Sequence, residues 1–276
     1  MTATSIPFSD LARGLRAIGQ QELLPRFEAG IDVDYKADGS VITEADHAVD
    51  ARVRELLRQH GQREPVLSEE QARAEQAQVL ETAPAFWLVD PLDGTSNFAG
   101  GMPFFAISIA RIAGDRVTHG ATYDPVRDEL FTATEDTALE LNAAAPPAAR
   151  RPPVPELKRA IALVDYKRLD DPLARELASH APFRSQRNLG ACALEWAWLA
   201  AGRADLYLHG GQAPWDSAAG GLILARAGGA MCDLGGRPVF GRSLAKRSAV
   251  AARSSALLAD WRAWLAPWLA PREDAS

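Results

Sequence analysis

Hydrophobic positions in the first half of the chain follow both helical and strand-like patterns. Apolar residues recur at helical spacing over residues 11–27 and again over residues 45–57, which predicts two helices. Between them, the stretch 34–42 combines a turn at Asp38–Gly39 with a short strand. Short runs rich in apolar residues predict strands at residues 65–67, 86–89, 105–112, 117–123 and 129–133. This half therefore mixes helices with a sheet, and Asp124–Pro125 predicts a hairpin turn.

In the second half, strand-like and helical patterns alternate. Strands are predicted at residues 160–164, 204–208 and 249–252. Helices are predicted at residues 191–201, 217–227 and 255–265. This alternation predicts an α/β layer.

A proline-rich segment, residues 143–155, separates the two halves and contains five of the 18 prolines. Because proline lacks a backbone N–H and fixes φ, the segment is unsuited to a helix interior or a central strand. We therefore expect a boundary between an N-terminal α+β part, residues 1–145, and a C-terminal α/β part, residues 154–276. A long surface loop within one domain is the alternative.

Composition narrows the class of protein. Of the 276 residues, 47 % are hydrophobic and 24 % are charged, which is the usual balance of a folded globular domain. The net charge of −6 argues against a basic nucleic-acid surface. Two cysteines without a C-x-x-C pair exclude a disulfide scaffold and a zinc–thiolate site. The chain starts without a secretory pattern, and no apolar run reaches the ~18–20 residues of a membrane helix, so we expect a cytoplasmic protein without a membrane partner.

Acidic residues follow the most apolar of these runs. Residues 86–98 read F-W-L-V-D-P-L-D-G-T-S-N-F, so that Asp90 ends a strand and Asp93 follows three residues later. Gly94 permits a tight turn, and Thr95 can cap a helix whose free N–H groups would bind an anion. An ordinary turn is the alternative, since D-P-L-D-G is good turn chemistry.

Two further acids occupy comparable places. Glu69 follows the short strand at 65–67, and Asp216 precedes the small-residue helix at 217–227. If these acids converge with Asp90 and Asp93, each pair of carboxylates ~5 Å apart would repel by about 3 kcal/mol at an effective dielectric of ~20. A cation would have to offset that repulsion, and all-oxygen ligands favour magnesium over calcium or manganese.

The acidic motifs also resemble those of a known family. Residues 87–98 are similar to the first signature of the inositol monophosphatase family, and residues 215–229 are similar to the second. K-A-D-G-S-V-I-T-E-A-D at 36–46 and L-S-E-E at 67–70 support the match, which spans about residues 10 to 265. The resemblance implies a layered α/β/α/β/α sandwich, magnesium-dependent and lithium-sensitive hydrolysis of phosphate monoesters, and a homodimer.

The resemblance also implies a metal-ligand set. Glu69, Asp90 and the backbone carbonyl of Leu92 would hold a first Mg²⁺ ion. Asp90, Asp93 and Asp216 would hold a second, and Glu69 could help to hold a weaker third. Glu69 rather than Glu70 is the expected ligand, because the first acid of the pair is the usual one in the family. Most of these ligands fall in the N-terminal part, and the C-terminal part would supply Asp216 and the rim of the substrate pocket.

Catalytic and phosphate contacts are implied in the same way. Gly94 and Thr95 would bind the phosphate through backbone N–H groups, and Thr95 with Asp46 would help to deprotonate the attacking water. Asp46 also fits a capping box with Thr43, and one residue can do both. Lys36 would either balance the acidic site or lie on the surface as a solvated charge.

Two residues bear on substrate choice. His209 lies seven residues before Asp216, where inositol-specific members usually carry a glutamate that accepts hydrogen bonds from the substrate. A histidine cannot replace a permanent anion, so His209 predicts a substrate with a second phosphate, an acidic group or a base. The alternative is a rim residue in a promiscuous phosphatase. Cys192 is expected either at the edge of the substrate pocket or as a small core residue.

The expected function is hydrolysis of a small phosphorylated metabolite by two-metal activation of water, with inositol 1-phosphate as the first candidate. A 3′(2′),5′-bisphosphate nucleotidase, a histidinol-phosphate phosphatase and a sugar-phosphate phosphatase are alternatives. The segment 94–98, G-T-S-N-F, resembles the inositol branch more closely. An alternative from another class is a regulatory protein that binds RNA or a protein partner, with incidental catalysis. The complete set of acids argues against it.

Overall fold

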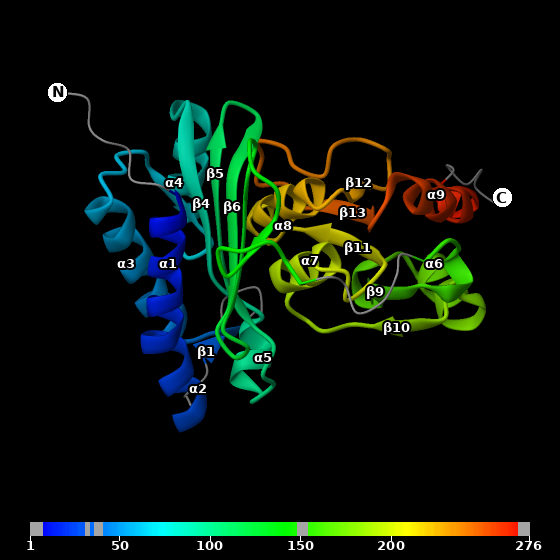
Figure 1. Ribbon diagram of the computed structural model, residues 1–276, viewed down its shortest axis with the longest axis horizontal. Helices are drawn as coiled ribbons and strands as arrows, with labels where there is room; N and C mark the ends of the chain where they lie inside the picture. Colours follow the sequence, from blue (N-terminus) through cyan, green and yellow to red (C-terminus); the bar gives the residue numbers. More distant parts are fainter. Residues whose placement is uncertain (1–7, 31–33, 36–40, 148–153, 270–276) are drawn as a thin grey trace.

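The structure is a computed structural model that describes residues 8–30, 34–35, 41–147 and 154–269. Its elements form five layers, in which two β-sheets alternate with three layers of helices (Figure 1). The expected α/β/α/β/α sandwich is therefore confirmed. Lys36, the Asp38–Gly39 turn and the centre of the proline-rich segment, residues 148–153, lie outside the described residues.

The first outer layer covers one face of the larger sheet with α1 (Phe8–Ile18), α2 (Leu24–Ala29) and α3 (Glu44–Gln59). The helix predicted over residues 11–27 contains a π-helical turn, η1 (Gly19–Leu23), between α1 and α2. A Cβ atom on Gly19 would lie 2.6 Å from a ring carbon of Tyr123, so glycine lets this turn approach the sheet. Below α3, the short strands β1 (Asp34–Tyr35) and β2 (Val41–Ile42) pair antiparallel.

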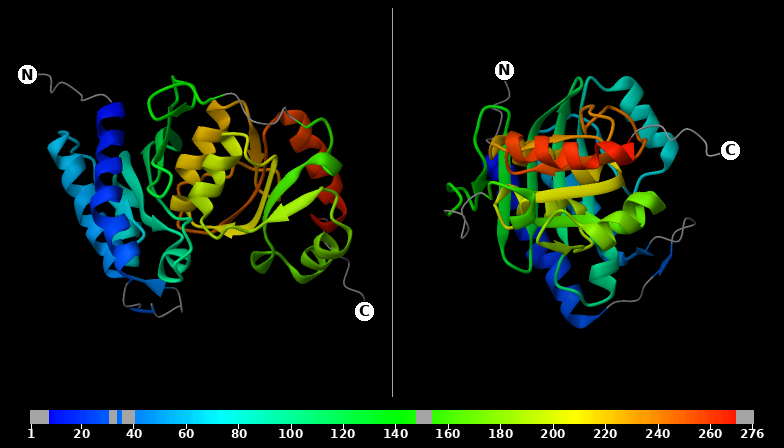
Figure 2. Two further views of the ribbon diagram at one scale, coloured as in Figure 1. Left: turned by 60° about the horizontal axis from the view of Figure 1, so that its bottom comes forward. Right: turned by 90° about the vertical axis from the view of Figure 1, so that its right-hand side faces the viewer.

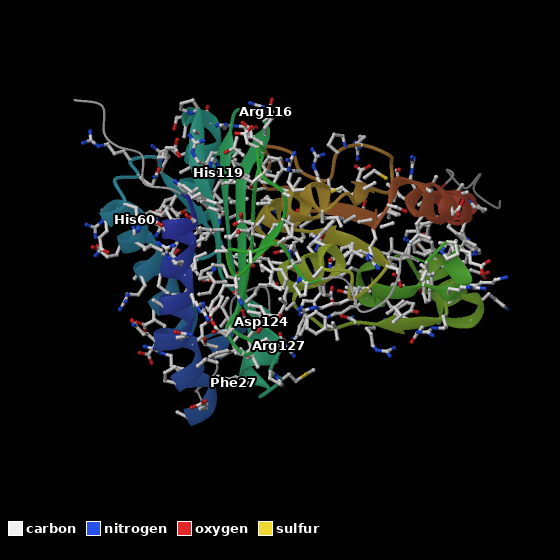
Figure 3. All side chains as sticks on the ribbon, in the orientation of Figure 1. Phe27, His60, Arg116, His119, Asp124 and Arg127 are labelled. Atoms are coloured by element: carbon white, nitrogen blue, oxygen red, sulfur yellow. The ribbon has the colours of Figure 1, made fainter. Side chains whose placement is uncertain are left out.

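The larger sheet has six strands in the order β3-β4-β5-β6-β7-β8. They are β3 (Val66–Ser68), β4 (Ala85–Asp93), β5 (Ala106–Ala113), β6 (Arg116–Asp124), β7 (Glu129–Thr134) and β8 (Glu140–Leu141). β3 runs parallel to β4, and the other neighbours are antiparallel. Figure 3 places His119 and Asp124 toward opposite ends of β6. Asp124 Oδ1 accepts the N–H groups of Val126 and Arg127 at 3.0 and 3.1 Å, which forms the predicted hairpin turn.

The middle layer consists of α7 (Cys192–Ala200) and α8 (Pro214–Arg226), which lie between the two sheets (Figures 1 and 2). Leu194 and Ile223 pack against the larger sheet, whereas Trp196 and Leu224 pack against the smaller one. A Cβ atom on Gly220 would lie 2.2 Å from Trp196 Cβ, so glycine lets α7 and α8 pack closely. Both helices are therefore apolar on two faces, because a sheet covers each side.

The smaller sheet has five strands in the order β10-β9-β11-β13-β12. They are β9 (Ile161–Asp165), β10 (Ser185–Arg187), β11 (Leu206–Gln212), β12 (Ala230–Cys232) and β13 (Arg247–Ala252). β9 is parallel to β10 and β11, and β13 is antiparallel to β11 and β12. The last layer, α6 (Asp171–His180) and α9 (Ser255–Leu269), covers its outer face.

Several elements differ from the sequence expectation. The helices α4 (Arg73–Thr82) and α6 and the strands β10 and β12 were not predicted. In α4 the side chain of Gln76 is the buried one, so no apolar periodicity marks the helix. The predicted strand at 86–89 was too short, because β4 continues to Asp93 with an irregular register after Asp90. None of the helices in the described part of the chain is long and apolar enough to cross a membrane.

Candidate active site

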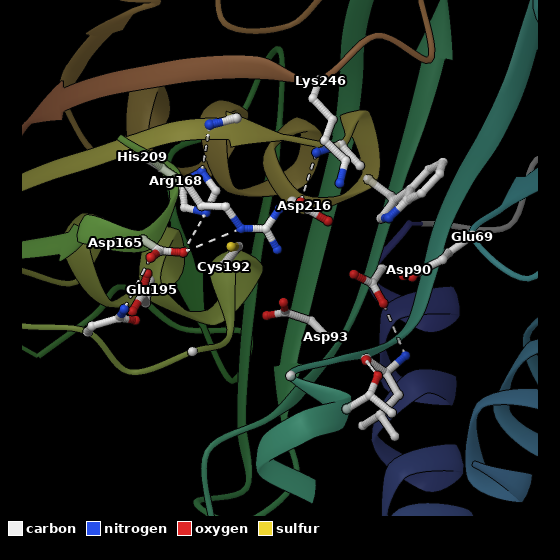
Figure 4. Close-up of a pocket in the computed structure, with 18 of the residues that line it drawn as sticks. Glu69, Asp90, Asp93, Asp165, Arg168, Cys192, Glu195, His209, Asp216 and Lys246 are labelled. Carbon is white, nitrogen blue, oxygen red and sulfur yellow. Dashed lines mark hydrogen bonds and ion pairs between the residues drawn. The ribbon is translucent and has the colours of Figure 1, made fainter. Parts of the chain in front are cut away.

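A cavity of about 280 Å³ lies where the ends of the two sheets meet the starts of the middle helices (Figure 4). On its inner wall lie Glu69, which directly follows β3, Asp90 and Asp93 of β4, and Asp216 of α8. On its outer wall lie Asp165, Arg168, His209 and Lys246, which come from the smaller sheet and its loops. Sequence segments far apart along the chain therefore form one cavity.

The irregular end of β4 positions the first two acids. Proline at position 91 cannot donate to a sheet hydrogen bond, and the register with β5 shifts between Asp90 and Asp93. Asp90 Oδ1 accepts the N–H of Leu92 at 3.1 Å, which forms a tight turn. Asp93 Oδ2 accepts the N–H of Leu194 at 3.0 Å, which ties this carboxylate to the first turn of α7. Both aspartates are buried and line the cavity.

Backbone contacts also place the other two acids. Asp216 Oδ2 accepts the N–H of Ala213 at 2.8 Å and so caps the start of α8, where Pro214 takes the first helical position. The N–H of Glu69 donates to the carbonyl of Val89 at 3.1 Å, which sets Glu69 beside the end of β4. Of the two neighbouring glutamates, Glu69 is the one that lines the cavity, as the sequence led us to expect.

These acids raise one another's pKa values. Burial and then the charges of Glu69, Asp93 and Asp216 raise the pKa of Asp90 well above its ordinary value. Burial and the charge of Asp93 raise the pKa of Asp216 to about 7. Burial, with the charges of Glu195 and Glu69, likewise raises the pKa of Asp93 to about 7, although the N–H of Leu194 opposes the shift. Burial and mutual repulsion therefore dominate the electrostatics of the inner wall.

The donor chemistry of the inner wall fits a hard divalent cation. Its side chains are carboxylates, and Leu92, which also lines the cavity, carries the backbone carbonyl expected as a ligand. Oxygen donors of this kind suit magnesium or calcium rather than softer metals. Across the described residues, no group of three or more histidine, cysteine or acidic side chains forms a ready-made metal cluster. The chemistry of the donors, rather than a closed cluster, makes these residues compatible with a cation.

The glycine turn after β4 is the segment that the sequence led us to expect at the phosphate, and its place at the cavity is defined by its backbone. Gly94 has φ of 87°, and a Cβ atom there would lie 2.8 Å from Ala191 Cβ, so only glycine fits. α5 (Thr95–Ala99) begins directly after it. Both Gly94 and Thr95 line the cavity.

Thr95 and Asp46 lie in contact. Thr95 Oγ1 lies 3.2 Å from Asp46 Oδ1 and 2.9 Å from the carbonyl oxygen of Leu92. Asp46 Oδ2 accepts hydrogen bonds from the N–H and the hydroxyl of Thr43, each at 2.7 Å, which forms the capping box of α3. The two roles considered for Asp46 are therefore geometrically compatible, because each uses a different oxygen. Its catalytic role stays a prediction.

The two residues expected near the substrate both line the cavity. Burial raises the pKa of the Cys192 thiol well above its ordinary value, so this side chain is a neutral lining group. The ring of His209 is buried, with Nε2 3.3 Å from Asp165 Oδ2. The His209 ring therefore lies against Asp165 and is not exposed on an open rim.

Sequence reasoning missed several polar residues of the cavity, which are Asp165, Arg168, Asn188, Glu195 and Lys246. A signal existed for Asp165, which follows the apolar run I-A-L-V just as Asp90 follows W-L-V. Glu195 Oε1 accepts the N–H of Leu189 at 2.7 Å and so holds the loop before α7. Burial raises the pKa of Glu195 to about 7.

Comparisons with known proteins agree with this architecture. The sequence model of the inositol monophosphatase family matches residues 7–266. Inositol monophosphatase 1 of Solanum lycopersicum is 34% identical over 211 residues, which cover 74% of this chain and 76% of that protein. The Nus factor SuhB of Escherichia coli strain K12 is 32% identical over 232 residues, which cover 75% of this chain and 76% of that protein.

Solved structures share the fold. An IMPase from Thermotoga maritima superposes with a TM-score of 0.80 at 24% identity, covering 95% of this chain and 97% of that one. An inositol monophosphatase from Anabaena superposes with a TM-score of 0.74 at 26% identity, covering 98% of both chains. Together with the match over residues 7–266, these likenesses establish that the chain belongs to the inositol monophosphatase family.

Proposed function

We propose that this protein is a magnesium-dependent phosphatase that hydrolyses small phosphate monoesters, with inositol 1-phosphate as the first substrate to test. The observation that carries the proposal is the convergence of four carboxylates, from Glu69, Asp90, Asp93 and Asp216, on one cavity. Membership of the inositol monophosphatase family supports phosphatase chemistry at that cavity.

Two groups of ligands follow from the inner wall and the family pattern. Glu69, Asp90 and the carbonyl of Leu92 would hold one Mg²⁺ ion, and Asp90, Asp93 and Asp216 would hold another. Glu69 could also help to hold a third. When bound, the cations supply positive charge that offsets the phosphate dianion and lowers the pKa of water. The repulsion among the carboxylates is thereby relieved.

The remaining steps belong to this chain's own residues. In the proposal, the N–H groups of Gly94 and Thr95 orient the phosphate, because they are the donors at the turn that lines the cavity. Thr95 Oγ1 takes a proton from the attacking water and passes its own to Asp46 Oδ1, which lies 3.2 Å away. The Thr43 hydrogen bonds hold Asp46 on its other oxygen, so its orientation is fixed before the substrate arrives.

The test is the turnover of inositol 1-phosphate and of p-nitrophenyl phosphate, each with millimolar magnesium and with a chelator. We expect hydrolysis with magnesium and its loss in the chelator. Full activity in the chelator would contradict the metal requirement. No activity on any phosphate ester with magnesium would contradict the phosphatase proposal as a whole.

A second candidate, from another class, is a regulatory protein, because the Nus factor SuhB is 32% identical to this chain. The discriminating result is a protein that binds RNA or another protein with unchanged affinity after the inner-wall acids are replaced, and that hydrolyses no phosphate ester. Lithium inhibition, a homodimer and a cytoplasmic location complete the phosphatase proposal. Turnover in lithium chloride and light scattering test the first two.

A further inference from the structure

The outer wall of the cavity carries a carboxylate, that of Asp165, which ends β9. β9 and β11 run parallel, and Asp165 pairs in register with His209. Side chains of paired residues project to the same face of a sheet. The two side chains therefore lie together at the end of the smaller sheet, as Figure 4 shows.

The surroundings of His209 determine where its proton lies. The N–H of Gly211 donates to Nδ1 at 3.1 Å, and a backbone N–H can only donate. Nδ1 is therefore the acceptor, and the proton is on Nε2, which points at Asp165 Oδ2 from 3.3 Å. Both ring nitrogens are thus used within the protein. Only 3% of His209 is exposed, and its ring stacks on the buried Tyr207 at an interplanar angle of 10°.

The expectation that His209 itself contacts the substrate therefore gives way to another role. A ring whose two nitrogens are engaged and whose surface is covered has no polar atom to offer a substrate. It does have a fixed donor for Asp165. His209 is thus a positioning residue for that carboxylate.

Asp165 keeps an acceptor site toward the cavity. Its Oδ1 accepts the N–H of Lys167 at 3.0 Å and the side-chain amide of Asn188 at 3.4 Å. Its Oδ2 accepts from His209, whereas Arg168 Nε lies 3.9 Å away, beyond hydrogen-bond distance. Each carboxylate oxygen can accept about two hydrogen bonds, so Oδ2 has one position left among the contacts of the described residues. The Asp165 side chain is 19% exposed and lines the cavity.

Asp165 is also held in its charged form. Burial alone would raise the pKa of this carboxyl, but the hydrogen bond from His209, the N–H of Lys167 and nearby positive charge, that of Arg168 included, together outweigh burial and lower it. The outer wall therefore presents a permanent anion of fixed orientation. His209 therefore does not carry the negative charge of this wall, which comes from Asp165 on the neighbouring strand.

We infer that Asp165, positioned by His209, accepts a hydrogen bond from a hydroxyl group on the alcohol part of the substrate. This inference rests on the proposed phosphatase function. A neutral hydroxyl can donate to Asp165 Oδ2 without repulsion from Arg168 or Lys246, which line the same cavity.

The test compares two esters that differ only in hydroxyl groups, inositol 1-phosphate and cyclohexyl phosphate. The measured quantity is the ratio of their kcat/KM values. Asp165→Asn should lower this ratio about 10-fold, because a charge-assisted hydrogen bond becomes a neutral one or is lost. Asp171→Asn is the matched control, since Asp171 is an exposed acid on α6, and it should keep the wild-type ratio.

Variants of His209 separate positioning from direct contact. His209→Gln keeps an N–H donor for Asp165 and should retain part of the ratio, whereas His209→Leu should lower it as Asp165→Asn does. His209→Glu sets a second carboxylate against Asp165 and should also lower the ratio. In His209→Glu combined with Asp165→Asn, the anion moves to β11 and the ratio should recover.

The outcomes are distinguishable. An unchanged ratio in Asp165→Asn, or a higher ratio in His209→Glu alone, overturns the role of Asp165. Failure of the wild-type protein to hydrolyse either ester with magnesium overturns the proposed phosphatase function and this inference with it. Thermal unfolding of all variants gives their Tm values and identifies any variant that fails to fold. If Asp165→Asn or His209→Leu fails to fold, the ratio in His209→Gln is compared with that of the wild-type protein, and a ratio that is neither retained in part nor lowered as expected overturns the role of Asp165.

Discussion

The two walls of the cavity use the same chemical group in opposite ways. On the inner wall, burial and neighbouring acids raise the pKa of Asp93 and of Asp216 to about 7. On the outer wall, burial also acts to raise the pKa of Asp165, but the hydrogen bonds from His209 and the N–H of Lys167, together with nearby positive charge, outweigh it and lower the pKa. The described hydrogen bonds of Asp93 and Asp216 come from backbone N–H groups, whereas Asp165 also has an imidazole donor.

The inner wall needs a bound cation or proton to be stable, whereas the outer wall does not. The inner acids repel one another in a poorly solvated place, so a cation or a proton relieves them. The outer acid already has its donor, so it can remain charged and ready for a substrate hydroxyl. One wall therefore suits cation-assisted chemistry and the other suits recognition.

The largest expected effect comes from removing one inner charge. Asp93→Asn should lower kcat about 100- to 1000-fold, because a carboxylate of the proposed cation site is lost. The metal-free variant should unfold at the wild-type temperature or above it, since a buried, repelled charge has been removed. Steady-state kinetics and thermal unfolding measure the two quantities. Wild-type turnover in this variant would show that the ligand set is wrong.

The contact between Thr95 and Asp46 comes next. Thr95→Val keeps the shape of the side chain but removes the hydroxyl that lies 3.2 Å from Asp46 Oδ1. We expect kcat to fall about 100-fold, the lower range for loss of a general acid–base group. Thr95→Ser retains a hydroxyl and serves as the matched control. If Thr95→Val and Thr95→Ser have equal kcat values, the Thr95 hydroxyl does not transfer a proton in the reaction.

A third prediction concerns the stability of the metal-free protein. The pKa values of Asp93 and Asp216 are about 7 in the folded state against 3.8 as the ordinary value, so the folded state binds more protons between these limits. Stability must therefore fall as the pH rises through this range and just beyond it, by about 3 kcal/mol for the two groups together between roughly pH 6 and pH 8. Urea unfolding in a chelator measures it.

Magnesium should change this pH dependence of the stability. A cation competes with protons for the inner acids, so it should stabilise the protein more at pH 8 than at pH 6. The outer wall makes no such contribution, because Asp165 is already charged. Equal stabilisation at both pH values would contradict cation binding at the inner acids.

The smallest expected effect concerns the support of the outer wall. A Cβ atom on Gly210 would lie 1.5 Å from the carbonyl oxygen of Arg168, so Gly210→Ala must displace the short helix η3 (Tyr166–Arg168) that follows Asp165. We expect the kcat/KM ratio of inositol 1-phosphate to cyclohexyl phosphate to fall by up to ~10-fold. Asp171→Asn, at the exposed acid on α6, is again the control. If the two variants have equal ratios, then displacing η3 does not affect recognition of the substrate hydroxyl groups.

Much of the fold could be predicted because its signals are local. The apolar run of β5 reflects a strand buried on both faces, and Asp124 forms the predicted turn through its own neighbours. α4 and β10 escaped prediction because they bury few apolar side chains. The acidic motif around Asp90 could also be recognised in the sequence, because its strand and its turn are each determined by a few neighbouring residues.

The amino-acid sequence by itself determined most of the strands and the tight turn between Asp90 and Asp93, because periodicity and turn chemistry depend on neighbours along the chain. Its motifs also resembled those of the family. Only the tertiary structure decided that His209 is almost fully buried and donates to Asp165 at the cavity wall. That outcome depends on the parallel register of β9 and β11 and on the N–H of Gly211. Charges and hydrogen bonds act through distances in space, which the order of residues does not specify.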